Sequence, residues 1–187
     1  LLLYHGGFLP DRGLVETIAV LARPELAAAH LVLLGEGPLA AHLRALAAEA
    51  PVAGRVHLLP PVPPDALLPW VASADVGVMP NQPRTLNERL STPNKLFESL
   101  AAGLPVVSSD FPERRRIIID DPAGPLGAVC DPTDPAALAG ALAGLLALPP
   151  TERAALRARV LAAAHARYTW ERQAAVLEQA YGRLTGR

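Results

Sequence analysis

The stretch Thr85–Asp110, TLNERLSTPNKLFESLAAGLPVVSSD, predicts a helix that leads directly into a buried strand. Its central part, PNKLFESLAAG, starts with a proline and ends with a glycine, as helices often do. The residues that follow, LPVVSSD, form a short apolar run typical of a buried strand. The only lysine of the chain, Lys95, lies here, and all three asparagines fall within fifteen residues of one another in or beside this stretch. Such a cluster of rare polar residues indicates a site.

The rest of the chain repeats this pattern of helices and strands. Five more apolar runs read as strands, namely LLLYHG, HLVLLGEG, RVHLLP, DVGVMP and GAVCDP, and helical segments separate them. Each run is continuously apolar rather than alternating, which is typical of a parallel sheet covered on both faces. We therefore expect an α/β fold, Rossmann-like, with a doubly wound parallel six-stranded sheet over residues 1–150.

The tail, residues 151–187, predicts a C-terminal helical extension that breaks into two helices near the sequence RYTWE. In the second helix, apolar residues recur at helical spacing, at Trp170, Ala174, Leu177 and Tyr181. This stripe packs either on the domain itself or on another domain, and we favour a bridging role for part of it. The chain begins inside an expected strand and without an initiator methionine, so we expect further sequence before it.

Composition narrows the class of protein. A chain with 51% hydrophobic residues and a net charge of -1 fits a globular domain, and no apolar run reaches the roughly eighteen residues that suggest a transmembrane segment. We interpret Arg114–Arg116 as a solvated helix face rather than a patch for nucleic acid. The lone Cys130 suits a reducing compartment, so we expect a cytoplasmic protein, with peripheral attachment to the inner face of the membrane as an alternative. The five histidines lack metal-ligand spacing, so we expect no metal site and no cofactor.

Two loops that follow strands contain glycines suited to ligand binding. The sequence HGGFLPDRG places Gly6 and Gly7 at a strand-to-helix turn, and Arg12 before the helix could bind a phosphate with two parallel hydrogen bonds. The alternative is that the glycines only form a turn and the arginine is solvated. In GEGP, the residues Gly35 and Gly37 follow the second strand, although this motif alone is more often just a tight turn.

The helix within the opening stretch predicts an anion site at its start. We expect residues 80–93 to form a long loop, with Thr92 as N-cap and Pro93 as the first helical residue. The amides of Asn94 and Lys95 then lie at the positive end of the helix dipole, which suits phosphate. Glu98 lies one turn further on, where its carboxylate could accept hydrogen bonds from a ribose diol. The alternative is an ordinary surface pair of Lys95 and Glu98.

Several motifs occur together in an order that resembles a known family. They are YHGGFLPDRGL, LVLLGEGPL, RVHLLPPVPPDALLPWVASADVGVMP, TPNKLFESLAAGLPVVSSD and YTWE, and they cover nearly the whole chain. Together they resemble the C-terminal, donor-binding domain of GT-B fold glycosyltransferases, in particular retaining family 4. The most specific piece is PNKLFESLAAGLPVV. The resemblance implies an enzyme that transfers a glycosyl group from a nucleotide diphosphate sugar, such as a UDP-, GDP- or ADP-sugar.

The resemblance also implies roles for particular residues. Glu98 would bind the ribose hydroxyls and Arg12 the diphosphate, while residues 35–38 and 60–63, which include Pro61 and Val62, would frame the base. Two positions depart from the family pattern. Gly7 stands where many relatives have an arginine, so that Lys95 could replace one phosphate contact. Leu90 stands where many relatives have a second glutamate, so that sugar contacts fall to neighbours such as Asn87, Glu88 or backbone amides.

The resemblance further implies that two domains bind the two substrates, the donor in this domain and the acceptor in another. An N-terminal domain would hold the acceptor, a sugar or a lipid-linked sugar, and the fragment alone would be inactive. Arg12, Lys95 and the helix amides would stabilise the leaving diphosphate without a required metal. Two alternatives to a glycosyltransferase remain open at this point, a GT-B sugar-nucleotide epimerase and a non-catalytic nucleotide-binding module. A nicotinamide oxidoreductase fits poorly, because the G-x-G-x-x-G fingerprint is absent.

Overall fold

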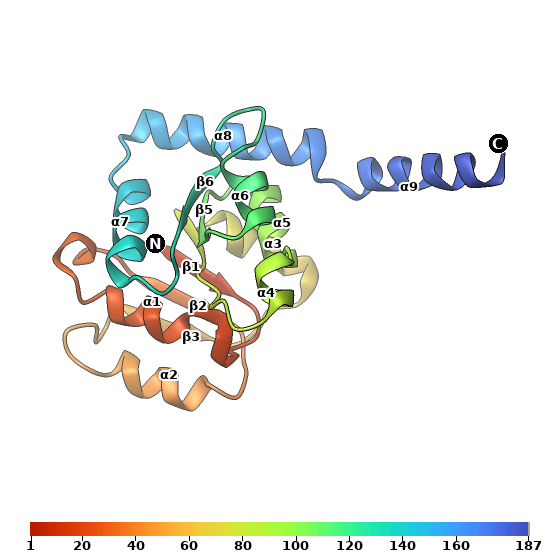
Figure 1. The fold of residues 1–187 in the computed structure, drawn as a ribbon. Helices are drawn as coiled ribbons and strands as arrows, with labels where there is room; N and C mark the ends of the chain where they lie inside the picture. The colour runs from red at the N-terminus through yellow and green to blue at the C-terminus, as the bar shows by residue number, and fades with distance from the viewer. Residues whose placement is uncertain (187) are drawn as a thin grey trace.

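The computed structural model describes residues 1–186, and at its centre lies a six-stranded sheet with helices on both faces (Figure 1). All neighbouring strands pair in parallel, in the order β3-β2-β1-β4-β5-β6. This order confirms the doubly wound sheet that the sequence predicts, and its switch point lies between β1 and β4. The strands are β1 (Leu2–His5), β2 (Leu31–Leu34), β3 (Val56–Leu59), β4 (Val76–Met79), β5 (Val106–Ser109) and β6 (Gly127–Cys130).

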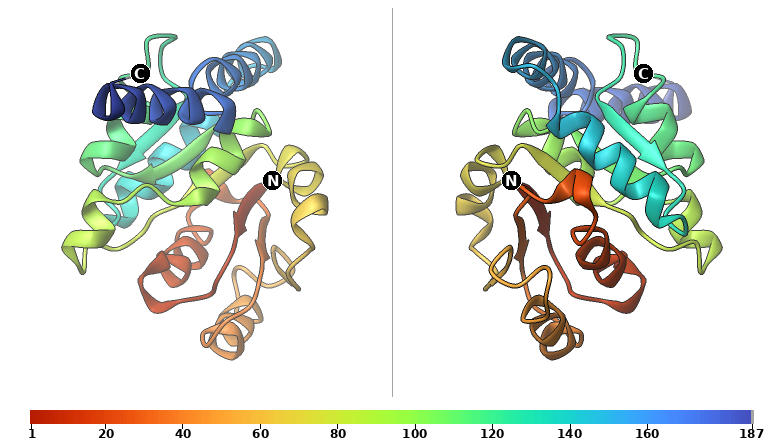
Figure 2. Two further views of the ribbon diagram at one scale, coloured as in Figure 1. Left: turned by 90° about the vertical axis from the view of Figure 1, so that its right-hand side faces the viewer. Right: turned by 90° about the vertical axis from the view of Figure 1, so that its left-hand side faces the viewer.

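Helices cover the sheet because strand side chains alternate between its two faces. Leu2 and Tyr4 of β1 join the core under α1, α2 and α7, whereas Leu3 joins the core under α3. Helices α5, α6 and α8 cover the remaining part of that second face, around Val106 (Figure 2). The helices are α1 (Leu14–Val20), α2 (Ala40–Ala47), α3 (Pro64–Ala72), α4 (Leu86–Leu90), α5 (Asn94–Ala101), α6 (Pro112–Ile118), α7 (Pro135–Leu146), α8 (Pro150–Arg167) and α9 (Trp170–Thr185).

The segment before α5 differs from the long loop that the sequence analysis expects. It contains the short helix α4, whose N-cap Thr85 accepts a hydrogen bond from the Glu88 amide at 3.2 Å. The T-x-x-E spacing is the sequence signature of such a cap. The expected start of α5 was also wrong by one residue, because Pro93 has the extended value of ψ, 148°, and is itself the N-cap. Helix α5 therefore begins at Asn94, and Thr92 does not cap it.

The three arginines of α6 do not share a solvated face, so this interpretation was wrong for Arg114. Successive residues of a helix point about 100° apart, so three in a row spread over more than half of its circumference and need not share one exposed face. Arg114 is 1% exposed, whereas Arg115 and Arg116 are exposed and pair with Asp110 and Glu113. The inward direction of Arg114 brings a guanidinium under the ends of β4 and β5.

The tail confirms the expected break, because α8 ends at Arg167 and α9 begins at Trp170. Helix α8 packs on the body through residues such as Leu156 and Val160. Helix α9 instead extends away from the body (Figure 1), and it has no buried residue. Its apolar stripe is exposed, with Leu177 at 49%. Among residues 1–186, no helix combines the length and apolar character that crossing a bilayer requires.

A test of the packing that positions the first loop is the variant Gly13→Ala. Gly13 has φ +69°, and a Cβ added to it would lie 2.1 Å from the carbonyl oxygen of Pro80. We expect the variant to lower the free energy of unfolding by about 3 kcal/mol or more, because steric overlap adds to a backbone strain of about 1–2 kcal/mol. The control Gly54→Ala has φ +79° but open space around the new Cβ, so only the strain remains. Urea denaturation of both variants measures the difference, and equal losses would contradict this account.

Candidate functional site

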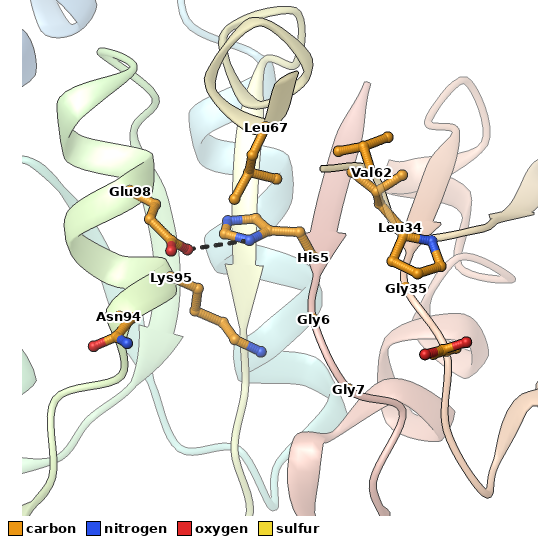
Figure 3. Close-up of a pocket in the computed structure, with 12 residues that line it drawn as sticks. His5, Gly6, Gly7, Leu34, Gly35, Val62, Leu67, Asn94, Lys95 and Glu98 are labelled. Atoms are coloured by element: carbon orange, nitrogen blue, oxygen red, sulfur yellow. Dashed lines mark ion pairs between the residues drawn. The ribbon is translucent and has the colours of Figure 1, made fainter. Parts of the chain in front are cut away.

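A cavity of about 620 Å³ lies at the carboxyl ends of β1 and β2 and the start of α5. This is the edge where doubly wound sheets bind ligands. In Figure 3, the side chains of Lys95 and Glu98 extend from α5 toward the end of β1. The residues that line the cavity are His5, Gly6, Gly7, Leu34, Gly35, Glu36, Pro61, Val62, Leu67, Asn94, Lys95 and Glu98.

Two glycines let the loops approach one another closely. Gly35 has φ +155°, and a Cβ on it would lie 2.1 Å from the carbonyl oxygen of Gly6. Gly6 has φ +117°, and a Cβ there would lie 3.2 Å from the Lys95 Nζ. Larger residues at these positions would fill the space between β1, β2 and α5. The glycines therefore serve the shape of the cavity as well as the turns.

Lys95 is a largely buried cation without an ion-pair partner among residues 1–186. Its Nζ lies 3.8 Å from the centroid of the Tyr4 ring, which is a cation–π contact. Among residues 1–186, no carboxylate forms an ion pair with it within 4.0 Å. Burial, followed by the charge of Arg12, lowers the pKa of Lys95 to about 7, and Glu98 opposes the shift only in part. Lys95 thus lies in a place that suits an anionic ligand.

Glu98 faces the cavity beside a buried histidine. The Nδ1 of His5 lies 3.5 Å from Oε2 of Glu98 (Figure 3). Burial, followed by the charge of Lys95, lowers the pKa of His5 to about 4, so the ring is neutral near pH 7 and the contact is not an ion pair there. Burial also raises the pKa of Glu98 above its usual value, against the effect of Lys95. The Glu98 carboxylate remains 38% exposed, so a ligand can reach it.

Asn94 and Lys95 also occupy the first turn of α5. The first amides of a helix have no partner within the helix, and they carry partial positive charge. The turn therefore adds backbone donors to the Lys95 ammonium at the same edge of the cavity.

Eight of the eleven predicted site residues line this cavity: Gly6, Gly7, Gly35, Pro61, Val62, Asn94, Lys95 and Glu98. Three lie outside its lining. Arg12 has a half-buried side chain 3.9 Å from Glu88, and its charge acts on Lys95. Gly37 packs against the backbone of Phe8, and Asn87 is exposed on α4.

The sequence analysis missed three side chains of the cavity, His5, Leu34 and Leu67. His5 ends an apolar run, and a polar residue at the carboxyl end of a buried parallel strand is the signal that could have identified it. Its Nε2 is buried and finds no hydrogen-bond partner among residues 1–186. Leu67 belongs to a helix whose apolar residues could equally serve the core, so no sequence signal separates it. Within the same residues, no three His, Cys, Asp or Glu side chains group closely enough to hold a metal ion.

The fold and this cavity define a doubly wound α/β domain with a candidate ligand site at the carboxyl ends of its strands. Residues 2–147 match the family described as Glycosyl transferases group 1, and the chain belongs to this family. The family explains why the alternating strands, the glycine turns and the Lys95–Glu98 helix occur together in one chain.

Comparisons with individual proteins agree with this family. A D-inositol 3-phosphate glycosyltransferase of Xylanimonas cellulosilytica is 35% identical over 145 residues, which cover 78% of this chain and 32% of that protein. Sucrose-phosphate synthase from Thermosynechococcus elongatus shares the fold, with a TM-score of 0.77, 24% identity and coverage of 99% of this chain and 45% of that one. HepE of Anabaena in complex with UDP has a TM-score of 0.76 at 15% identity, covering 100% and 49% of the two chains. The chain spans about a third of the length of the curated relative.

The lowered pKa of Lys95 predicts that its charged form lowers the free energy of unfolding of the domain. With a pKa of about 7 when folded and 10.5 as its ordinary value, the folded state binds fewer protons than the unfolded state between these pH values. The cost is therefore complete below about pH 7 and disappears as the pH rises toward 10.5.

Lys95→Met keeps the length of the side chain and removes the charge. We expect its unfolding midpoint at pH 6 to lie above that of the wild type by about 2–4 °C or more, since about 1 kcal/mol causes such a shift in a domain of this size. The gain should shrink between pH 7 and pH 10. Thermal unfolding followed by circular dichroism across this pH range measures it. A variant less stable than wild type at pH 6 would contradict the assignment of Lys95 as an uncompensated cation.

Proposed function

We propose that this chain is the donor-binding domain of a glycosyltransferase and that its cavity holds a nucleotide diphosphate sugar. The observation that supports this most directly is the pairing of Lys95 and Glu98 on one face of α5, at the carboxyl ends of the strands. One is a buried cation without an ion-pair partner among residues 1–186, and the other is an accessible carboxylate one turn further on. Such a layout suits a ligand with an anionic part and a neighbouring diol.

The diphosphate would bind at the first turn of α5. Lys95 and the amides of the first turn supply positive charge, and Arg12 adds to it from the first loop. The low pKa of the free lysine has a consequence for binding, because an arriving diphosphate favours the protonated form. We therefore expect the nucleotide to bind together with a proton when the pH lies above about 7.

The nucleoside would lie along the other side of the cavity. Glu98 accepts hydrogen bonds from the ribose hydroxyls, and the charge of Lys95 favours its ionised form. The loops with Gly35 and with Pro61 and Val62 frame the base. Because the solved structure of HepE contains UDP, we take UDP as the first choice of nucleotide.

The chemistry would be transfer of the glycosyl group to an acceptor hydroxyl with retention at the anomeric carbon. The bond between the sugar and the β-phosphate breaks, and the leaving diphosphate gains negative charge. Lys95 and the first-turn amides would face this charge and Arg12 would act on it from outside the cavity lining, and together they would stabilise the transition state without a required metal. The acceptor, a sugar or lipid-linked sugar, would be held by an N-terminal domain of the whole protein. The buried thiol of Cys130 suits a cytoplasmic location.

The identity of the nucleotide can be tested by a thermal-shift panel with UDP, GDP, ADP and TDP. A ligand that binds only the folded state stabilises it by RT ln(1 + [L]/Kd), so the preferred base gives the largest shift. We expect UDP to give that shift. If none of the four nucleotides raises the unfolding midpoint, the proposal of a donor site is wrong.

Two variants separate a donor site from an ordinary surface pair. Glu98→Gln keeps the shape of the side chain, and we expect it to weaken UDP binding by on the order of 1.5–3 kcal/mol, as for a lost hydrogen bond to a charged group. Lys95→Ala should weaken binding and, in the full-length enzyme, slow transfer further, because charge builds up at the diphosphate. The control Glu171→Gln lies in the exposed first turn of α9 and should bind UDP normally. Titration calorimetry measures the affinities, and unchanged binding in both site variants would support the surface pair.

A further inference from the structure

Arg114 is a second buried cation, and nothing in the proposed binding site uses it. Its side chain is 1% exposed, and its guanidinium lies under the ends of β4 and β5. Nη1 donates to Oδ1 of Asn81 at 3.1 Å, to the carbonyl of Met79 at 3.4 Å and to Oγ of Ser108 at 3.5 Å. The guanidinium also lies 4.9 Å from the centroid of the Phe111 ring.

These partners are dipoles, and none of them is an anion. No carboxylate of residues 1–186 lies within 4.0 Å of Arg114, and its Nε is buried without any partner in that part of the chain. Carbonyl groups also hold Arg55, which is only partly buried, whereas two other arginines have carboxylate partners. Arg115 on the same helix pairs with Asp110, and Arg167 pairs with the fully buried carboxylate of Asp121. A buried charge without a counter-ion is costly, so its retention calls for an explanation.

The charge of Arg114 reaches the candidate site. Burial lowers the pKa of Arg114 to about 10, with a further contribution from Arg12 and an opposing one from Glu88. Arg114 in turn is one of the charges that lower the pKa of Lys95. Arg12, Lys95 and Arg114 therefore act on one another as a group of three cations. Because neutral dipoles hold the guanidinium without cancelling its charge, its field extends through the weakly screening interior.

We propose that Arg114 is a third cation of the diphosphate site, which attracts the ligand through space from beneath the sheet ends without touching it. This inference rests on the proposed donor site. It explains why a buried arginine is held by carbonyl, amide and hydroxyl groups, since a carboxylate partner would neutralise the charge. The incoming diphosphate supplies the missing negative charge.

The sharpest test is Asn81→Asp. This change keeps the size of the side chain and the acceptor that faces Nη1 of Arg114, and it adds a negative charge next to the guanidinium. The paired arginine keeps the new carboxylate ionised. We expect a domain at least as stable as wild type whose affinity for UDP is nevertheless lower by about threefold or more. A purely structural role of Arg114 predicts unchanged or tighter binding, because the contact to residue 81 becomes stronger.

Arg114→Met removes the charge and keeps much of the volume. Two unit charges roughly 10 Å apart at an effective dielectric constant of about 20 attract each other with an energy that corresponds to about a tenfold change in affinity. We expect UDP to bind about tenfold more weakly and uridine to bind within about twofold of wild type, because uridine lacks the diphosphate. Arg115→Met is the matched control, since it removes an equal charge from an exposed site on α6. It should change neither affinity by more than about twofold.

The measurements are calorimetric titrations of UDP and uridine into each variant, with thermal unfolding to verify folding. If UDP is not the preferred nucleotide of the panel above, the preferred diphosphate and its nucleoside take its place. Equal losses for diphosphate and nucleoside, or wild-type binding of UDP by Asn81→Asp, would overturn the role of Arg114 and leave the donor site standing. Absence of nucleotide binding by the wild type would overturn both. If Arg114→Met fails to fold, the Asn81→Asp result decides.

Discussion

The close approach of the turns after β1 and β2 is the constraint on which the candidate site depends. Gly35 lies against the backbone of Gly6 where any side chain would overlap it, so the two loops form one continuous floor. Lys95 then lies over that floor from α5, on the other side of the switch point. The sheet order, the glycine turns and the start of α5 together form the cavity, and a change in any one of them would alter its shape.

The chemistry of the candidate site depends on two cations that the fold buries without carboxylate partners among residues 1–186. Most ionic groups of the chain are exposed or paired, but Lys95 and Arg114 are buried beside an aromatic ring and neutral dipoles. Their depressed pKa values express the same physical fact, which is that burial without a counter-ion disfavours the charged form. In the donor site that we propose, this loss of stability in the free state is offset by attraction of the diphosphate, and functional sites commonly show such a compromise.

The sequence predicted the fold and much of the cavity, because both depend on local patterns. Continuous apolar runs identified every strand, and the single lysine identified the helix at the site. The direction of Arg114 was missed because three consecutive arginines were treated as one face, although a helix turns each by about 100°. The helix α4 was missed because the T-x-x-E signal at Thr85 was not weighed against the length of the loop. His5 was missed because a polar residue at the carboxyl end of an apolar run was not treated as a signal, whereas Leu67 lies in a helix whose apolar pattern does not separate core from cavity.

The helical structure of α9 depends on contacts with another surface more than that of the other helices does. It has 16 residues, none of them buried, and its apolar side chains face solvent. A helix near this length is marginal in water unless tertiary contacts support it. Because residues 1–186 bury none of α9, we expect its helical content to rise when a surface covers Trp170 and Tyr181. We therefore expect the folding of α9 and its docking on such a surface to be coupled in a single step.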